Sequence, residues 1–269
     1  MKTIIKIASI FFVLLFSAGY TQNEKINYNV FQPGETLIYK VKWTFIRLGT
    51  ITIKTESIDG NSDYVKISML VESSPGLFFI NIKEYNESIV DVRNCMSVSY
   101  YGDFINGSEK TKIFTSYNQT TGTASVKIID DVNKKEIFSD TIYNSPRYVE
   151  GPSLFFFTRA LSKAGRTFNV PTMIEGAIEN TKIVFTDTKE ELTVDAFPEP
   201  VLTRKYYGIA EWEGGTSQGM SGDFTGWITA DDAAIPVYAE VEVLLGSLKI
   251  ELEECIRNKT SYKTVKELK

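Results

Sequence analysis

The stretch "LIYKVKWTFIRLGTITIKTE", residues 37–56, alternates apolar and polar side chains with the two-residue period of a β-strand. In its first part, residues 37–45, every odd position is apolar, and these positions include Trp43 and Phe45. After the sequence "IRLG", residues 46–49, isoleucines again alternate with Thr and Lys. The two runs therefore predict an antiparallel hairpin, turning at "IRLG", with one buried and one solvated face.

Alternating runs of this kind fill most of the chain, and turns rich in Gly, Asn, Asp or Pro separate them. The clearest pair, residues 237–243 and 248–252, flanks a Gly-Ser turn at Gly246. The regular helix-strand alternation of parallel α/β proteins is absent. The sequence therefore predicts an all-β fold with one short central helix, in which a strongly curved antiparallel sheet forms an open barrel, a roll or a sandwich.

The predicted helix lies in "GPSLFFFTRALSKAG", residues 151–165. Pro152 suits the first helical turn, and Gly165, following Lys163, suits a left-handed stop. Apolar side chains lie on more than one side of this helix, so a single buried stripe cannot cover them all. We therefore expect the helix to be enclosed by the concave side of the sheet.

Two interpretations of this enclosed helix remain open. In the first, its phenylalanines are a core plug, because burial of each ring stabilises the fold by about 1.5–3 kcal/mol without any ligand. In the second, they line an apolar cavity, since ligand pockets are mostly apolar with few polar groups. The second interpretation names as candidate lining residues Phe155, Phe156, Trp43 and Phe45.

The N-terminus has the pattern of a secretory signal peptide: Lys2 and Lys6 precede or adjoin an apolar run, residues 7–16, which small residues follow. That run is shorter than the roughly 20 residues that span a bilayer. We therefore expect export to the periplasm, the cell envelope or the medium. The predicted organisation is a signal peptide (1–21), a linker (22–30), a single β-rich domain (31–258) and a polar tail (259–269).

Composition narrows the set of partners. The net charge of −5 argues against a nucleic-acid partner, which needs a basic face. No segment after the signal peptide is apolar enough to predict a transmembrane helix. The two cysteines, Cys95 and Cys255, permit one disulfide in an exported chain, but two separate thiols are equally compatible with their positions.

The sequence lacks most catalytic motifs. It contains no histidine, which excludes Ser-His-Asp and Cys-His sites and His zinc ligands. No phosphate-binding loop, dinucleotide fingerprint or calcium loop is present, so we expect neither a cofactor nor a metal ion. Asp231 and Asp232 could supply oxygen ligands or an acid-base pair, but adjacent acids before a proline more often form a capped turn.

Several stretches resemble the bacterial exported family known as domain of unknown function 3108. The resemblance is carried by "FQPGETLIYKVKWTFIRLGTITI", "GPSLFFFTRAL", "GWITADDAAIPVYAEVEV" and "LGSLKIEL", and in the first stretch by Gly34, Glu35, Leu37, Tyr39, Trp43, Gly49 and Thr50. It implies an envelope location and a β-rich fold, but no reaction. The resemblance implies an Asp before the helix and an Arg within it. Gly151 stands where that Asp is expected, whereas Arg159 is retained. Arg159 is therefore added to the candidate lining residues.

The sequence supports three functional hypotheses. The first is a non-enzymatic envelope protein that binds or carries an apolar or amphipathic molecule, such as a lipid or glycoconjugate, because aromatic residues make up 13% of the chain. The second is a structural or adaptor module that binds another envelope protein through a sheet edge or an exposed patch. The third is a hydrolase of envelope polysaccharide that uses two facing carboxylates.

Overall fold

The computed structural model of the protein describes residues 25–257, apart from residues 78–80, 212–219 and 244–245. The predicted signal peptide, the start of the predicted linker and the predicted polar tail lie outside the described residues. The described residues form a 3-10 helix, a short α-helix and fourteen strands. These are η1 (Tyr28–Val30), β1 (Thr36–Trp43), β2 (Ile46–Ile58), β3 (Asn61–Ser73), β4 (Ile82–Asp91), β5 (Met96–Asn106), β6 (Glu109–Asn118), β7 (Thr123–Asp130), β8 (Lys135–Ile142), α1 (Gly151–Ala160), β9 (Thr167–Ile174), β10 (Ala177–Leu192), β11 (Val201–Glu211), β12 (Met220–Thr229), β13 (Pro236–Val243) and β14 (Gly246–Ile256).

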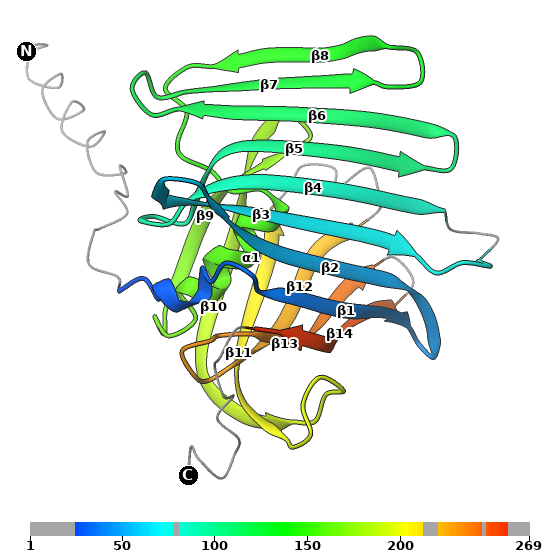
Figure 1. Ribbon diagram of the computed structural model, residues 1–269, viewed down its shortest axis with the longest axis vertical. Helices are drawn as coiled ribbons and strands as arrows, with labels where there is room; N and C mark the ends of the chain where they lie inside the picture. The colour runs from blue at the N-terminus through cyan, green and yellow to red at the C-terminus, as the bar shows by residue number, and fades with distance from the viewer. Residues whose placement is uncertain (1–24, 78–80, 212–219, 244–245, 258–269) are drawn as a thin grey trace, which may run out of the picture.

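The strands belong to one antiparallel sheet with the order β8-β7-β6-β5-β4-β3-β2-β1-β14-β13-β12-β11-β10-β9. Two meanders, β1 to β8 and β9 to β14, are joined where β1 pairs with β14. Strands β8 and β9 are the two edges, so the sheet is not closed into a continuous barrel. Figure 1 shows the sheet curving round, with α1 between its two halves. The prediction of a strongly curved antiparallel sheet with one short helix is confirmed.

The segment between the two edge strands passes through the concave side of the sheet. Just before α1, the Val149 amide donates to the Pro171 carbonyl at 2.9 Å, and the Met173 amide donates to the Val149 carbonyl at 2.9 Å. The Ser97 amide donates to the Tyr148 carbonyl at 3.0 Å. The residues before α1 are therefore bonded to β9 on one side and to β5 on the other, which holds the start of the helix in place.

The first hairpin turns at Thr44 and Phe45, not at the predicted "IRLG". Thr44 takes the left-handed conformation, with φ of 55°, that tight two-residue hairpins require. Gly49, expected in the turn, lies instead within β2, where a Cβ atom would be 2.4 Å from the carbonyl oxygen of Glu72. That glycine therefore permits the close approach of β3.

Helix α1 has polar contacts at both ends. The Glu150 amide donates to the Ser153 hydroxyl at 2.7 Å, and the Asn27 amide donates to the Ala160 carbonyl at 3.0 Å. Because Asn27 occupies that carbonyl, the helix ends at Ala160, before the expected stop at Gly165, which does adopt a left-handed φ of 61°. No helix in the described part of the chain is long and apolar enough to cross a bilayer.

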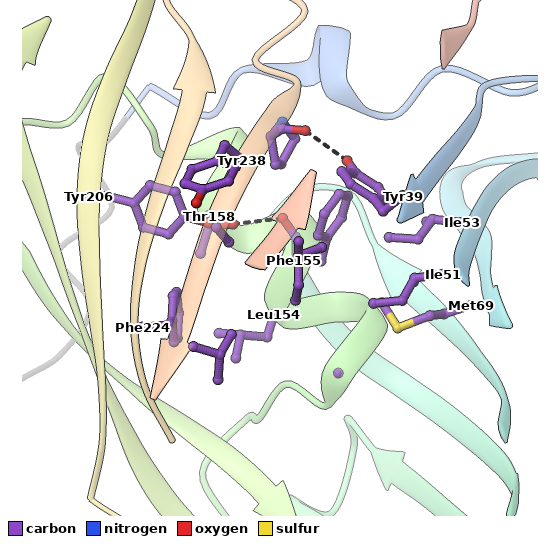
Figure 2. Close-up of a pocket in the computed structure, with 15 residues that line it drawn as sticks. Tyr39, Ile51, Ile53, Met69, Leu154, Phe155, Thr158, Tyr206, Phe224 and Tyr238 are labelled. Carbon is purple, nitrogen blue, oxygen red and sulfur yellow. Dashed lines mark hydrogen bonds between the residues drawn. The ribbon is translucent and has the colours of Figure 1, made fainter. Parts of the chain in front are cut away.

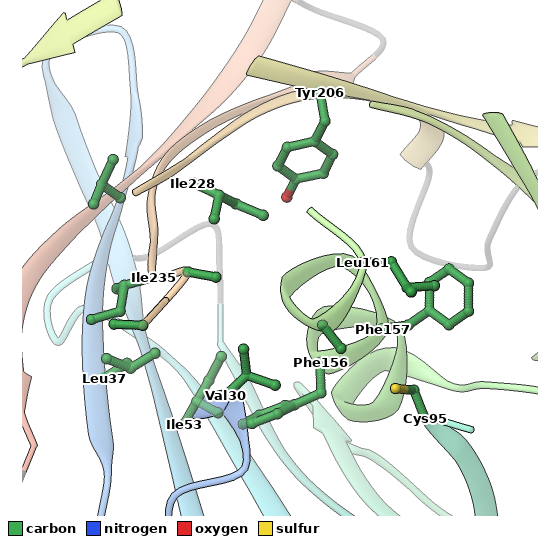
Figure 3. Packing of buried hydrophobic residues seen from close by; sticks show 14 of the residues in the cluster. Val30, Leu37, Ile53, Cys95, Phe156, Phe157, Leu161, Tyr206, Ile228 and Ile235 are labelled. Atoms are coloured by element: carbon green, nitrogen blue, oxygen red, sulfur yellow. The ribbon is translucent and has the colours of Figure 1, made fainter. Parts of the chain in front are cut away.

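The main core lies between α1 and the sheet (Figure 3). Phe156 and Phe157 are at most 1% exposed, and they extend from the helix in different directions. The Phe156 ring stacks on Phe31 at a centroid distance of 5.5 Å. Val30 is also fully buried. The end of the segment that we expected to be a linker therefore packs on the core.

A row of aromatic rings crosses the second half of the sheet. Neighbouring rings in this row have centroid distances between 5.7 and 5.9 Å, and the row runs through Phe157, Phe168, Phe185, Tyr206 and Phe224. Gly226 leaves room for it, because a Cβ atom there would lie 2.4 Å from the Tyr206 ring. The row connects α1 with β9, β10, β11 and β12 by tilted and edge-to-face contacts, which aromatic pairs favour.

Cys95 and Cys255 do not form a disulfide in the structure. Cys95 follows β4 in a tight turn, whereas Cys255 is on β14, and three strands lie between β4 and β14 in the sheet. A disulfide needs Cα atoms within about 7 Å of each other, and neighbouring strands are already about 4.8 Å apart. The possible bridge is therefore corrected to two separate thiols.

Candidate apolar binding pocket

Helix α1 does not fill the whole concave side of the sheet. A cavity of about 220 Å³ remains between one side of the helix and strands of both meanders (Figure 2). Its walls come from β1, β2 and β3 on one side and from β11 to β14 on the other. The lining residues are Tyr39, Ile51, Ile53, Met69, Gly151, Leu154, Phe155, Thr158, Tyr206, Phe224, Pro236, Tyr238, Ala239, Val241 and Ile250.

None of these lining residues carries a formal charge, and three of the hydroxyl groups are already bonded within the protein. The Tyr39 hydroxyl donates to the Pro236 carbonyl at 2.9 Å, and the Thr158 hydroxyl donates to the Phe155 carbonyl at 2.8 Å. The Tyr238 hydroxyl donates to a Glu240 carboxylate oxygen at 2.8 Å. The cavity therefore presents mainly carbon atoms to any molecule that enters it, as small-molecule pockets do.

The cavity has a closed end and an open end. Tyr39 and Tyr206 are buried and form part of the closed end, whereas Met69, Leu154 and Phe224 are partly exposed and form part of the mouth. Burial raises the pKa of Tyr206 to about 12, so its hydroxyl stays protonated at neutral pH. The closed end thus keeps its neutral, apolar character at physiological pH.

Of the candidate lining residues named from the sequence, only Phe155 lines this cavity, where its ring meets Tyr39 edge-to-face at 6.1 Å. Phe156 is in the core, and Arg159 is in a buried ion pair. Trp43 ends β1 and is not among the lining residues. Phe45 is 91% exposed at the hairpin tip, because the turn begins earlier than expected.

Most of the pocket was missed by reasoning from the sequence. Tyr206, Phe224 and Val241 lie far along the chain from the helix and reach it only because the sheet curves. Alternation places each of them on the apolar side of its own strand. That signal identifies an inward position, but it does not say which inward positions from the two meanders face each other.

Arg159 anchors the helix to the rest of the core. Its side chain is fully buried, and its Nη1 and Nη2 atoms donate to the two carboxylate oxygens of Glu35 at 2.6 and 3.0 Å. It also donates to the carbonyls of Ala234 at 3.0 Å and Ala233 at 3.1 Å. Arg257 donates to the same carboxylate. The Arg159–Glu35 pair therefore holds α1 against the start of β1.

Glu150, directly before α1, is a buried carboxylate whose hydrogen-bond partners are hydroxyl groups. It accepts from Ser153 at 2.9 Å and from Ser88 and Thr115 at 3.4 Å each. Burial raises its pKa from the ordinary 4.5 to about 7, although these hydroxyl groups act in the opposite direction. The family resemblance implies an acid at the position of Gly151, one residue later.

The buried Glu150 is expected to make the protein less stable as the pH rises. The Glu150 carboxyl holds its proton more tightly in the folded state than in the unfolded state. Its contribution to the free energy of unfolding is therefore complete below the unfolded pKa of 4.5, and it is lost as the pH rises through about 7. The shift corresponds to about 3 kcal/mol of unfolding free energy. Urea unfolding of wild type and Glu150→Gln at both pH values measures this loss.

Gln retains the size of Glu150 but cannot titrate, so the Glu150→Gln protein should lack this part of the pH dependence. Glu72→Gln is the matched control, because the Glu72 side chain is 45% exposed and pairs with Lys83 at 2.8 Å. This control should keep the wild-type change in unfolding free energy with pH. An identical change in all three proteins would show that the Glu150 carboxyl does not titrate in this range.

The carboxylates considered for catalysis have structural partners. Asp231 accepts from the Thr229 hydroxyl at 2.7 Å and from the Ala234 amide at 3.3 Å, and Asp232 pairs with Lys163. This arrangement is the capped turn that adjacent acids before a proline more often form. Among the described residues, no group of three or more Asp, Glu or Cys side chains is placed to hold a metal ion.

Comparison with protein families identifies the relatives of the chain. Residues 38–253 match the family described as protein of unknown function DUF3108. The chain belongs to this family. A search among curated proteins gives no match. The DUF3108 match includes every residue that lines the pocket, from Tyr39 to Ile250, and confirms the resemblance found in the sequence.

Comparison with solved structures bears on the fold of the chain alone. A β-barrel-like protein of domain of unknown function DUF1849 from Brucella abortus has a TM-score of 0.55 at 8% identity, over 84% of this chain and 98% of that one. A candidate exported protein with a YmcC-like fold from Bacteroides fragilis has a TM-score of 0.32 at 8% identity, over 84% and 97%. A candidate lipoprotein from Parabacteroides distasonis has a TM-score of 0.28 at 10% identity, over 86% and 99%. Of these three structures, the Brucella protein has a TM-score above 0.5, and it supports the β-barrel-like architecture.

Proposed function

We propose that the protein is a non-enzymatic envelope protein that binds or carries an apolar or amphipathic molecule in the pocket beside α1. The observation that carries this proposal is the cavity of about 220 Å³ whose lining contains no charged side chain. A core that served stability alone would be more stable if this space were filled, because side chains around an empty volume lack packing contacts on that side. A pocket for a hydrocarbon chain explains why it stays open.

The cellular location is part of the same proposal. The signal-peptide pattern of residues 1–21 supports export, although it lies outside the described residues. An exported protein meets lipids and glycoconjugates of the envelope, whose acyl chains match the apolar lining. A lipid or glycoconjugate is therefore the class of ligand that combines the location with the pocket.

Filling the pocket is expected to weaken binding without unfolding the protein. Ala239 lines the cavity from β13, so the ring introduced by Ala239→Phe would take up part of its volume. We expect the affinity for an apolar fluorescent probe to fall by at least about tenfold, equivalent to about 1.4 kcal/mol. Probe titration, followed by fluorescence, measures the dissociation constant.

The matched control is Ala177→Phe, which adds the same ring at an exposed position at the start of β10. It should bind the probe like wild type. Absence of probe binding by wild type would refute the proposal, and so would equal affinity in wild type and Ala239→Phe. Circular dichroism of each variant verifies that the β-sheet is retained.

A second function is favoured by the edge strand β8. Ile137 and Phe138 on this strand are 56% and 40% exposed, and an edge strand can accept a strand from another protein. In this adaptor hypothesis a photo-crosslinker introduced at Ile137 captures one envelope protein in stoichiometric amount. If the crosslinker captures no such protein from envelope fractions, the pocket hypothesis stands alone.

A further inference from the structure

The turn between β1 and β2 lies at the same end of the sheet as the mouth of the pocket. Tyr39 belongs to the closed end, and β1 runs from it toward the turn at Thr44 and Phe45. Strand β3 runs in the same direction, since β1 and β3 both pair antiparallel with β2, and it passes Met69 at the mouth before it ends at Ser73. Figure 1 shows this turn at the right-hand end of β1 and β2, with η1 at the other end of β1. A ligand that leaves through the mouth therefore moves toward the turn.

A strip of apolar side chains connects the pocket with this turn. Val41 and Trp43 follow Tyr39 at alternate positions of β1, so their side chains lie on the same concave side of the sheet. Leu248 on β14 is directly opposite Trp43, and Val241, which lines the pocket, is directly opposite Leu248. Val41, Trp43 and Leu248 are each partly exposed. We call these three residues the apolar strip.

The tip of the hairpin extends the apolar strip into solvent. Among the described large apolar side chains, Phe45 is the most exposed, at 91%. The four residues from Trp43 to Ile46 carry no charge. Single exposed apolar residues are common on protein surfaces, but Phe45 continues an apolar path that begins in a cavity. Exposed apolar surface of this kind marks a contact site for a partner or a membrane.

The charged residues of this hairpin nearest to the tip are cations. Lys42 and Arg47 flank the turn and lie opposite each other in the register of β1 and β2. Lys42 pairs with Glu251 at 3.3 Å, and Arg47 pairs with Glu253 at 2.7 Å; both carboxylates are on β14, farther from the tip. The strand ends beside the hairpin carry both signs, on Glu72, Lys83, Glu242 and Lys249. Because these charges largely compensate one another, apolar contact must supply most of the affinity at the tip.

The size and chemistry of the tip fit a lipid bilayer better than a protein surface. A stable protein interface buries about 800 Å² on each partner, whereas one aromatic side chain buries about 150–250 Å². Trp43 and Phe45 together are therefore too small for such an interface. Trp is enriched where a bilayer meets water, and Lys and Arg side chains extend from an apolar contact toward the head groups. The order from Lys42 to Arg47 matches this arrangement.

We propose that the β1–β2 turn docks on a lipid bilayer, with Phe45 in its apolar layer and Trp43 at the interface, so that the ligand moves along the apolar strip between bilayer and pocket. This inference rests on the proposed function, because the ligand path requires a molecule that the pocket binds. Two aromatic rings bury less apolar surface than the pair of lipid chains that stable anchoring requires, so the contact is reversible. A carrier needs such a contact, since it must leave the bilayer again.

Vesicle binding tests the docking without use of the pocket. The chain is prepared without residues 1–21, because the apolar run of the predicted signal peptide would itself bind lipid. Sedimentation with vesicles of phosphatidylethanolamine and phosphatidylglycerol measures the partition coefficient. We expect Phe45→Ser to lower this coefficient by about tenfold, because the variant loses the burial of one ring.

Tyr143→Ser is the matched control. Tyr143 is 75% exposed and follows the end of β8, which runs in the opposite direction to β1 and therefore ends away from the mouth. This variant should bind vesicles like wild type. An equal loss in Phe45→Ser and Tyr143→Ser overturns the assignment of docking to the β1–β2 turn.

Probe transfer tests the path of the ligand. Phe45 is not among the lining residues, so Phe45→Ser should keep the wild-type dissociation constant for the apolar fluorescent probe. Transfer of bound probe from wild type to vesicles should become faster in proportion to the vesicle concentration, because it requires contact. In Phe45→Ser the transfer should be about tenfold slower.

The outcomes separate this inference from the proposed function. Absence of vesicle binding by wild type overturns the inference and leaves the pocket in place. A transfer rate that does not depend on vesicle concentration also overturns it, because the probe then leaves through water. Capture of one envelope protein by a photo-crosslinker at Phe45, without vesicle binding, assigns the tip to a protein partner instead. If wild type binds vesicles but no probe, the proposed function fails, and only the docking remains.

Discussion

Replacing Phe157 by Ala is expected to lower the free energy of unfolding by about 3–5 kcal/mol, the range observed for large aromatic residues in cores. Its side chain is 1% exposed and begins the aromatic row, with the Phe168 ring 5.7 Å away in an edge-to-face contact. Truncation leaves a cavity that neither α1 nor β9 can close without moving. Urea unfolding at fixed pH measures the loss, provided that the dependence of the unfolding free energy on urea concentration is the same in both proteins.

Two other phenylalanines provide the controls for Phe157. Phe155 borders the pocket and is partly exposed, so Phe155→Ala should cost less than Phe157→Ala. Phe45 is 91% exposed, and Phe45→Ala should change stability by less than about 0.5 kcal/mol. A loss at Phe157 no larger than that at Phe155 would contradict the assignment of Phe157 to the core.

Arg159→Met is expected to destabilise the protein by about 3–5 kcal/mol, because it removes one partner of a buried ion pair. Glu35 is 1% exposed and would keep only Arg257 as a charged partner. The carbonyls of Ala233 and Ala234 would also lose their donor. Thermal or urea unfolding measures this effect, and far-UV circular dichroism verifies that the sheet still forms.

The electrostatic cost of removing Arg159 can be separated from the cost of lost packing. In the double variant Glu35→Gln with Arg159→Met, the Glu35 carboxylate that Arg159 neutralised is also gone, so the loss should be smaller than the sum of the two single losses. Lys163→Met removes the exposed pair with Asp232 and should cost less than about 1 kcal/mol. Additive losses at Glu35 and Arg159 would show that the two residues are not coupled.

The strand pattern was predictable because alternation is a local property. Tyr39 and Ile53 were placed on the apolar side from their positions alone, and both are buried in the core. The hairpin turn was not predictable from the same pattern, since it depends on Thr44 tolerating a left-handed backbone. A non-glycine residue in that conformation is uncommon, and the sequence offered Gly49 as the more usual choice.

The pocket was only partly predictable for a physical reason. Phe155 could be named because the helix carries more apolar surface than one face can bury. Phe224 and Tyr206 could not, because they meet the helix only through the curvature of the sheet. Glu150 gave no signal, because a buried carboxylate and a solvated one look alike in a sequence.

The central claim is that a hydrocarbon chain occupies the cavity beside α1, and methyl NMR tests it most directly. With isotope-labelled methyl groups and added decanol, we predict intermolecular contacts to Met69, Ile51 and Leu154, which line the cavity. Met173, buried in a separate cluster, should show none. Contacts confined to Ile137 on the edge strand, or no contacts at all, would contradict the account.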